Sequence, residues 1–141
     1  MKLLLPVDGS ECSLHAVDHA IKLAKENGPV SIHLLNVYDA PVRLGDVGVR
    51  LSAEEMRKIE SEQKDSSFGP AERRLKDAGV SYDHEVLAGD IAPAIARRAG
   101  ELGSDAIVMG TRGHGALAEL VVGSVAMKVV RLARVPVTLV R

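Results

Sequence analysis

Five short apolar runs, separated by longer amphipathic segments, are the feature that most limits how this chain can fold. The runs lie at 2–7, 30–37, 80–87, 105–110 and 136–140. The second, fourth and fifth are almost continuous in Val, Ile and Leu, as are strands buried on both faces of a parallel sheet. The third alternates apolar and polar residues, which indicates an edge strand. We therefore predict a single α/β domain over residues 1–141, with an open parallel sheet and helices on both faces.

The segments between the runs carry helix start signals. The residues expected to cap these helices are Ser10, Ser52, Asp90 and Ser124. Glu55 completes a capping box with Ser52 and opens a helix that runs to Ala78. Within that helix, Gly69-Pro70 is expected to kink or break it, because proline lacks the amide proton and its ring clashes with the preceding turn.

Composition excludes several classes of function. The formal net charge of −1 gives no sign of a nucleic-acid partner, and an aromatic content of 2% leaves few rings to stack on bases. Cys12 is the single cysteine, so no internal disulfide can form. The opening "MKLLLPVDGS" has an apolar run too short for a signal peptide or a membrane span. We therefore expect a cytoplasmic protein without a membrane partner.

The glycine-rich segment "MGTRGHGALAELVVGS" at 109–124 is the candidate functional motif. It leaves the carboxyl end of the fourth strand, where ligands bind in open α/β sheets, and reaches the fourth helix. The backbone N–H groups of Gly123, Ser124 and Val125 are expected to be unpaired there and to attract an anion. Two simpler interpretations stay open: the glycines only permit turning, and the Ser124 hydroxyl only caps the helix.

Two widespread phosphate motifs do not fit this segment. A Walker A loop requires Lys-Ser or Lys-Thr after its last glycine, and no glycine here is followed by either pair. The pattern G-x-G-x-x-A does occur at 113–118, but it follows the fourth strand instead of the first. The region about 20 residues further on also lacks the acidic residue that binds a ribose. We reject both motifs.

The spacing Gly110-x₂-Gly113-x₉-Gly123-Ser124 after "IVM", together with "PVDGS" at the end of the first strand, resembles the ATP-binding branch of the universal stress protein family. The resemblance covers the whole chain, including "IHLLNVYDA", "GDIAPAIARRAGELGSDAIVMGTRG" and "VPVTLVR". It implies a Rossmann-like sheet in the order 3-2-1-4-5, with ATP in the crevice between the first and fourth strands.

The resemblance also implies roles for individual residues. Asp8 would accept hydrogen bonds from the nucleoside. The adenine would be lined by Pro6, Val7, Val37 and Met109. The phosphates would be wrapped by Gly110, Arg112 and Gly113, and held at their far end by Gly123, Ser124 and Val125. Mg²⁺ is expected to bridge phosphate oxygens, because the loop alone does not neutralise a triphosphate.

Each assignment has a simpler structural alternative. Asp8 before Gly9-Ser10 can make a turn without binding anything, and Val7, Val37 and Met109 can be ordinary core residues. Arg112 can be a solvated cation of the loop. The role of His114 stays open.

Neither a catalytic residue nor a metal site within the protein is predicted. His15 and His19 have a metal-compatible spacing on the first helix, but the sequence places no third ligand beside them. Catalysis would need a base near the γ-phosphate, for which Asp8 and His114 are the candidates, and Asp8 is expected at the nucleoside end.

The resemblance implies a homodimer paired through the last strand, at Val135, Pro136, Val137, Thr138, Leu139 and Val140. We expect a nucleotide-gated adaptor or sensor in the stress response, and not an enzyme. The alternatives are a slow ATPase or phosphotransferase, and a nucleotide-free dimerisation module. AMP or a cyclic nucleotide is an alternative ligand. The protein client and the kind of stress stay open.

Overall fold

The structure, a computed structural model, describes residues 1–39, 52–114 and 121–141. The loop expected after the second strand, at 40–51, lies outside the described residues. The same holds for 115–120 in the glycine-rich segment, and so for most of the rejected dinucleotide pattern.

The strands of the described part form one parallel sheet of order β3-β2-β1-β4-β5. They are β1 (Lys2–Pro6), β2 (Ser31–Tyr38), β3 (Tyr82–Ala88), β4 (Ala106–Gly110) and β5 (Val137–Val140). The fold class and strand order are therefore confirmed, and β3 is an edge strand as its alternating pattern indicated. Leu3 in β1 lies opposite Ile32 on one side and Ala106 on the other, so the chain order reverses at β1 and β4.

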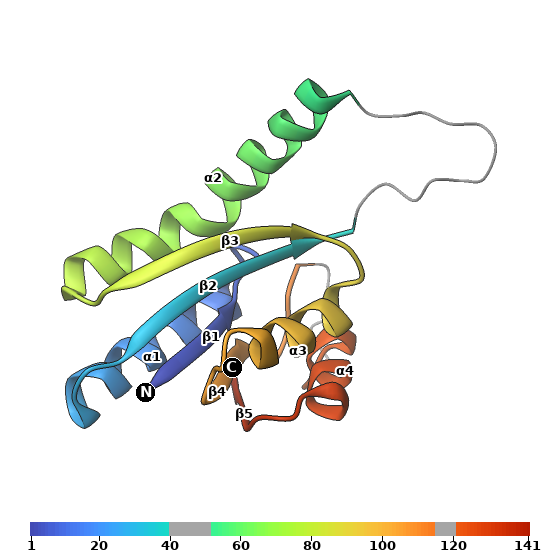
Figure 1. Cartoon of the computed structure of the whole chain (residues 1–141). Helices are drawn as coiled ribbons and strands as arrows, with labels where there is room; N and C mark the ends of the chain where they lie inside the picture. The colour runs from blue at the N-terminus through green and yellow to red at the C-terminus, as the bar shows by residue number, and fades with distance from the viewer. Residues whose placement is uncertain (40–51, 115–120) are drawn as a thin grey trace.

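Two helices cover each face of the sheet (Figure 1). The helices α1 (Glu11–Asn27) and α2 (Ala53–Ala78) pack on one face, and α3 (Ile91–Glu101) and α4 (Ser124–Leu132) pack on the other. Each pair encloses an almost entirely aliphatic core. Among the described residues, Phe68 of α2 is the one fully buried aromatic ring, and it lies in the core under α1 and α2. Within the residues described, no helix is both long and apolar enough to cross a membrane.

Two of the predicted helix caps are confirmed. The Ser10 hydroxyl accepts a hydrogen bond from the Ser13 N–H at 3.3 Å. At the start of α2, Glu55 N–H donates to the Ser52 hydroxyl at 3.1 Å, and Ser52 N–H donates to the Glu55 carboxylate at 2.7 Å. This reciprocal pair is a complete capping box.

The other two caps differ from prediction. Asp90 occupies the capping position of α3, but its side chain makes no capping hydrogen bond. The prediction for Ser124 is wrong, because the capping residue of α4 is Gly123 and Ser124 is the first helical residue. The Ser124 hydroxyl therefore lies one position too far along the chain to cap the first turn.

Pro70 bends α2 but does not break it. The helix is continuous from Ala53 to Ala78 with Pro70 inside it, and Figure 1 shows its axis changing direction in the middle. The buried residues of α2 all lie from Ser67 onward. The bend thus separates a half that packs on the sheet from an amino-terminal half that stands out from it.

Candidate functional site

A cavity of about 490 Å³ opens at the carboxyl ends of the strands, where the chain order reverses between β1 and β4. Its walls come from β1, β2 and β4, from the loops that follow β1 and β4, and from α1, α3 and α4. Every residue predicted for the nucleotide site contributes to these walls: Pro6, Val7, Asp8, Val37, Met109, Gly110, Arg112, Gly113, Gly123, Ser124 and Val125. The structure therefore brings together residues from three separate parts of the chain, and binding itself stays a prediction.

Asp8 does form the tight turn that was its simpler interpretation. Its Oδ1 accepts a hydrogen bond from the Ser10 N–H at 2.9 Å, and Gly9 between them has a φ of +80°. This is an Asx turn, in which a short carboxylate fixes the backbone two residues further on. Because Ser10 in turn caps α1, the position of the carboxylate is tied to the start of that helix.

The other carboxylate oxygen of Asp8 lies against Gly113. A β-carbon at position 113 would collide with Asp8 Oδ2, so a larger residue would force the carboxylate or the loop to shift. Beside it, the His114 ring donates from Nε2 to the Asp8 carbonyl oxygen, 2.8 Å away. The loops after β1 and β4 thus meet at Asp8, and His114 is one of the residues that join them.

Gly110 is required by helix packing. A β-carbon there would lie 2.8 Å from the carbonyl carbon of Cys12 in the first turn of α1. Backbone atoms cannot move aside cheaply, so β4 can approach α1 this closely only through a glycine. The resemblance assigns Gly110 to phosphate binding. Its packing against α1 is a second, independent reason for a glycine at position 110.

The amino terminus of α4 faces the cavity with fewer free donors than predicted. The Gly123 N–H, expected to be unpaired, donates to the Thr111 carbonyl oxygen at 2.6 Å. The first bond inside the helix runs from the Met127 N–H to the Gly123 carbonyl oxygen at 3.0 Å. The amides without an acceptor inside the helix are therefore those of Ser124, Val125 and Ala126, one residue later than predicted.

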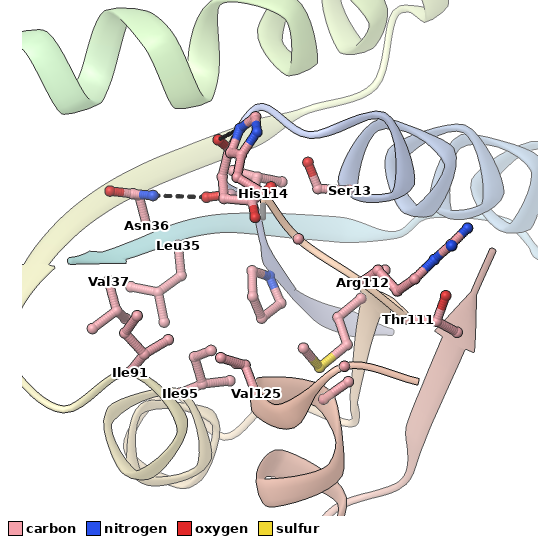
Figure 2. Close-up of a pocket in the computed structure, with 18 of the residues that line it drawn as sticks. Ser13, Leu35, Asn36, Val37, Ile91, Ile95, Thr111, Arg112, His114 and Val125 are labelled. Atoms are coloured by element: carbon pink, nitrogen blue, oxygen red, sulfur yellow. Dashed lines mark hydrogen bonds between the residues drawn. The ribbon is translucent and has the colours of Figure 1, made fainter. Parts of the chain in front are cut away.

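The opposite end of the cavity is apolar. Figure 2 shows the side chains of Leu35, Val37, Ile91 and Ile95 gathered there. Val37 and Met109 are 8% and 6% exposed and belong to the same aliphatic core that α3 and α4 cover. The two interpretations of these side chains are compatible, because the core itself forms the wall of the cavity.

β1 and β2 separate beside this apolar end. The Val7 N–H donates to the Leu35 carbonyl oxygen at 2.9 Å, and the chain then turns away at Asp8 and Gly9. Asn36 fills the gap, donating from Nδ2 to the Val7 carbonyl oxygen at 2.8 Å. In a parallel strand, alternate residues direct their backbone groups to the same neighbour. The N–H and C=O of Val37 therefore point toward the side where β1 has ended.

Arg112 contributes to the wall at the loop after β4. In Figure 2 its side chain extends away from the apolar end.

The sequence predictions missed several wall residues: Ser13, Leu35, Asn36, Ile91, Ile95, Thr111, His114 and Ala126. Ile91 and Ile95 were identified as the apolar side of their helix, but nothing local says that this side lies over a cavity. Asn36 had a usable signal, since it is a polar residue in an otherwise apolar run. Its Oδ1 and the Thr111 hydroxyl are buried without a hydrogen-bond partner among the described residues.

Known proteins are similar to this chain in sequence and in fold. The model of the universal stress protein family matches residues 1–141. Universal stress protein MJ0531 of Methanocaldococcus jannaschii is 32% identical over 140 residues, which is 99% of this chain and 81% of that protein.

Two solved structures have the same architecture. The structure of hypothetical protein MJ0577 from M. jannaschii has a TM-score of 0.80 and 27% identity, covering 99% of this chain and 94% of that one. A universal stress protein in complex with cAMP has a TM-score of 0.66 and 25% identity, covering 100% and 96%. From the match over its full length and the relative that is 32% identical, this chain belongs to the universal stress protein family.

Proposed function

We propose that this protein binds an adenine nucleotide, with ATP as the expected ligand, in the cavity between β1 and β4. One observation carries the proposal: a single cavity of about 490 Å³ joins an apolar end to the amino terminus of a helix. Cavities of this size are ordinary for small-molecule sites. The complex of a family member with cAMP supports an adenine nucleotide as the class of ligand.

The apolar end suits the base. Leu35, Ile91 and Ile95 offer flat aliphatic surfaces, and the backbone of Val37 presents a donor and an acceptor side by side. Adenine presents the complementary pair along its Watson–Crick edge, at N1 and the exocyclic amine. We infer that base recognition depends on the backbone at Val37, while the side chains exclude water.

The other end suits phosphate. The amides of Ser124, Val125 and Ala126 lie at the positive end of the α4 dipole, and Arg112 is also part of the cavity wall. When Mg²⁺ is present, it supplies neutralising charge to the phosphate oxygens. Because Mg²⁺ keeps several of its waters, it requires no cage of protein carboxylates. The residues described here contain no group of three or more His, Cys, Asp or Glu that could form one.

We propose binding without an enzymatic role. The two candidate bases, Asp8 and His114, both hold the loops after β1 and β4, and Asp8 is expected at the nucleoside end. Asp8 accepts from Ser10 and lies against Gly113, and His114 donates to the Asp8 carbonyl oxygen. These contacts give both groups a structural role in joining the two loops.

We propose further that two copies of the chain pair through β5, and that nucleotide occupancy changes which proteins the dimer contacts in the cytoplasm under stress. β5 is an edge of the sheet, and Val137, Leu139 and Val140 are only partly buried there. An edge of this kind is a template for a further strand.

The decisive experiment removes one phosphate donor without disturbing the fold. Ser124 is the first residue of α4, a position that proline favours, and Gly123 before it is extended at φ −75° and ψ 166°. Ser124→Pro therefore deletes a single N–H. Ser124→Ala controls for the hydroxyl. Ala53→Pro is the matched control at the first position of α2, far from the cavity.

Calorimetric titration with ATP-Mg²⁺ should show that Ser124→Pro loses at least about tenfold in affinity, the worth of one hydrogen bond to a charged group. Ala53→Pro should bind as the unaltered protein does, and adenosine should bind all variants equally. If the unaltered protein binds no adenine nucleotide and none co-purifies with it, the proposal is wrong.

A further inference from the structure

The turn that holds Asp8 is packed from outside by the bend of α2. A β-carbon at Gly9 would lie 2.6 Å from the carbonyl oxygen of Ser66 and 3.6 Å from the α-carbon of Ser67. Gly9 also has a φ of +80°, which side-chain-bearing residues rarely adopt. Glycine is thus required at position 9 for two separate reasons. The positive φ is local to the turn, whereas the close approach to Ser66 depends on α2.

The Ser66 carbonyl can face Gly9 because of Pro70. In a helix, this carbonyl would accept a hydrogen bond from the N–H four residues later, but proline has none and its ring displaces the carbonyl. The Ser66 hydroxyl bends the helix further by donating back to the Glu62 carbonyl oxygen at 2.9 Å. The bend in Figure 1 therefore turns a carbonyl that would have been internal to the helix toward the Asp8–Ser10 turn.

The same turn is held on its inner side by the glycine-rich loop. Gly113 lies against Asp8 Oδ2, and His114 donates to the Asp8 carbonyl oxygen. The Asx bond from Ser10 to Asp8 Oδ1 spans Gly9, so any shift of Gly9 is passed to the carboxylate. The turn is therefore held between the bend of α2 and the cavity.

We propose that the Ser66 carbonyl, exposed by Pro70, is the positioning group that sets Asp8 for nucleotide binding through its contact with Gly9. The inference rests on the proposed function, together with the expectation from the family resemblance that Asp8 accepts hydrogen bonds from the nucleoside. α2 contributes no residue to the cavity wall. By this inference, α2 nevertheless helps to determine the affinity for the nucleotide.

The experiment compares glycines that share backbone strain but differ in contact. Gly9→Ala adds a methyl group against Ser66 and displaces the turn. Gly28→Ala is the matched control, because Gly28 has a φ of +86° and nothing within 4 Å of its would-be β-carbon. Both variants should lower the melting temperature. Only Gly9→Ala should weaken ATP binding, by at least about tenfold, the worth of one hydrogen bond to a charged group.

Two further variants show whether the effect passes through α2 and Asp8. Pro70→Ala restores an N–H that can recapture the Ser66 carbonyl, so it should weaken ATP binding alone and recover part of the loss in Gly9→Ala. In an Asp8→Ala background, Gly9→Ala should cost no further affinity, because the group it positions is gone.

The outcomes separate this inference from the proposed function. If the unaltered protein binds no nucleotide, both are wrong. If it binds and Gly9→Ala resembles Gly28→Ala, only this inference is wrong. It is also wrong if Gly9→Ala costs as much without Asp8 as with it. Should Gly9→Ala fail to fold, Pro70→Ala decides alone, and an unchanged affinity for ATP overturns the proposal.

Discussion

Asp8 and Gly113, which are 105 positions apart in the chain, meet so closely that the missing side chain of Gly113 is what leaves room for the Asp8 carboxylate. The contact joins the loop after β1 to the loop after β4, at the point where the sheet reverses its order. It explains in one geometric relationship why an acid at the first strand and a glycine at the fourth belong to the same site.

Gly113→Ala is expected to lower the affinity for ATP by at least about tenfold, since the new methyl group must displace either the carboxylate or the loop. The melting temperature should change little, because Asp8 is a side chain that can move. Calorimetric titration and a melting curve measure the two effects. Gly100→Ala in α3, which has nothing within 4 Å of the would-be β-carbon, is the control. An unchanged affinity would contradict the role given to this contact.

Gly110→Ala is expected to act on stability instead. Its β-carbon would meet backbone atoms of Cys12 at 2.8 and 2.9 Å, and those atoms move only if α1 moves. Overpacking of this kind costs about 1–3 kcal/mol of unfolding free energy. Urea denaturation measures it, with Gly100→Ala again as the control. A variant as stable as the unaltered protein would show that α1 is not held against β4 at this point.

Asn36→Ala is expected to cost about 1–3 kcal/mol of unfolding free energy, because the buried Val7 carbonyl oxygen loses the donor that satisfies it. The matched control is Asn27→Ala. Asn27 also donates to a backbone carbonyl, that of Leu23 at 3.2 Å, but in an exposed place. That control should cost no more than about 0.5 kcal/mol. Equal costs in urea denaturation would mean that the burial of Asn36 contributes nothing.

Stability at high pH should depend on Tyr38. Burial, and secondly the negative charge of Glu60, raise the pKa of its hydroxyl above the ordinary 10.0. In the unfolded chain the hydroxyl ionises at its ordinary pKa, so the folded state holds more protons above that pH and its stability falls as pH rises. Below pH 10 the group has no effect.

Tyr38→Phe should therefore flatten the fall of unfolding free energy above pH 10, and Glu60→Gln should flatten it in part. Chemical denaturation over a pH series measures the slopes. Glu62→Gln, on the same helix, is the control. If Tyr38→Phe leaves the alkaline slope unchanged, the raised pKa is not what weakens the fold there.

The free edge of β5 provides a test of the proposed dimer. The carbonyl of Pro136 accepts from Ile107 in β4, and that of Val140 accepts from Thr111 just after it, so the backbone groups of Leu139 point to the open side. Leu139→Pro removes an outward N–H without breaking the ladder to β4, and Leu139→Ala controls for the lost side chain. Analytical ultracentrifugation should find Leu139→Pro monomeric and Leu139→Ala dimeric. The same mass for both variants would rule out pairing through this strand.

Much of the fold was accessible from local pattern. The continuous apolar runs at 30–37 and 105–110 predicted buried parallel strands, and the alternating run at 80–87 predicted the edge strand β3. The continuous run at 136–140 is the exception, because β5 lies at the other edge of the sheet and is only partly buried. Ser10 and the Ser52–Glu55 pair marked helix starts, because these caps are made within one turn of chain. The prediction for Ser124 was wrong because it used only local pattern, in which a serine before an apolar helix indicates a cap. The start of α4 depends instead on where the preceding loop is held.

The candidate site shows the same contrast between local sequence pattern and tertiary contacts. The sequence by itself determined which residues are available to it, because the glycine spacing, "PVDGS" and the strand order put them at one edge of the sheet. Only the tertiary structure decided what each residue does there. Gly110 lies against the backbone of Cys12, and Gly113 lies against the carboxylate of Asp8. The Gly123 N–H donates a hydrogen bond to the Thr111 carbonyl oxygen. These contacts join segments distant in the chain, and local propensity carries no information about which distant backbone will approach a given glycine.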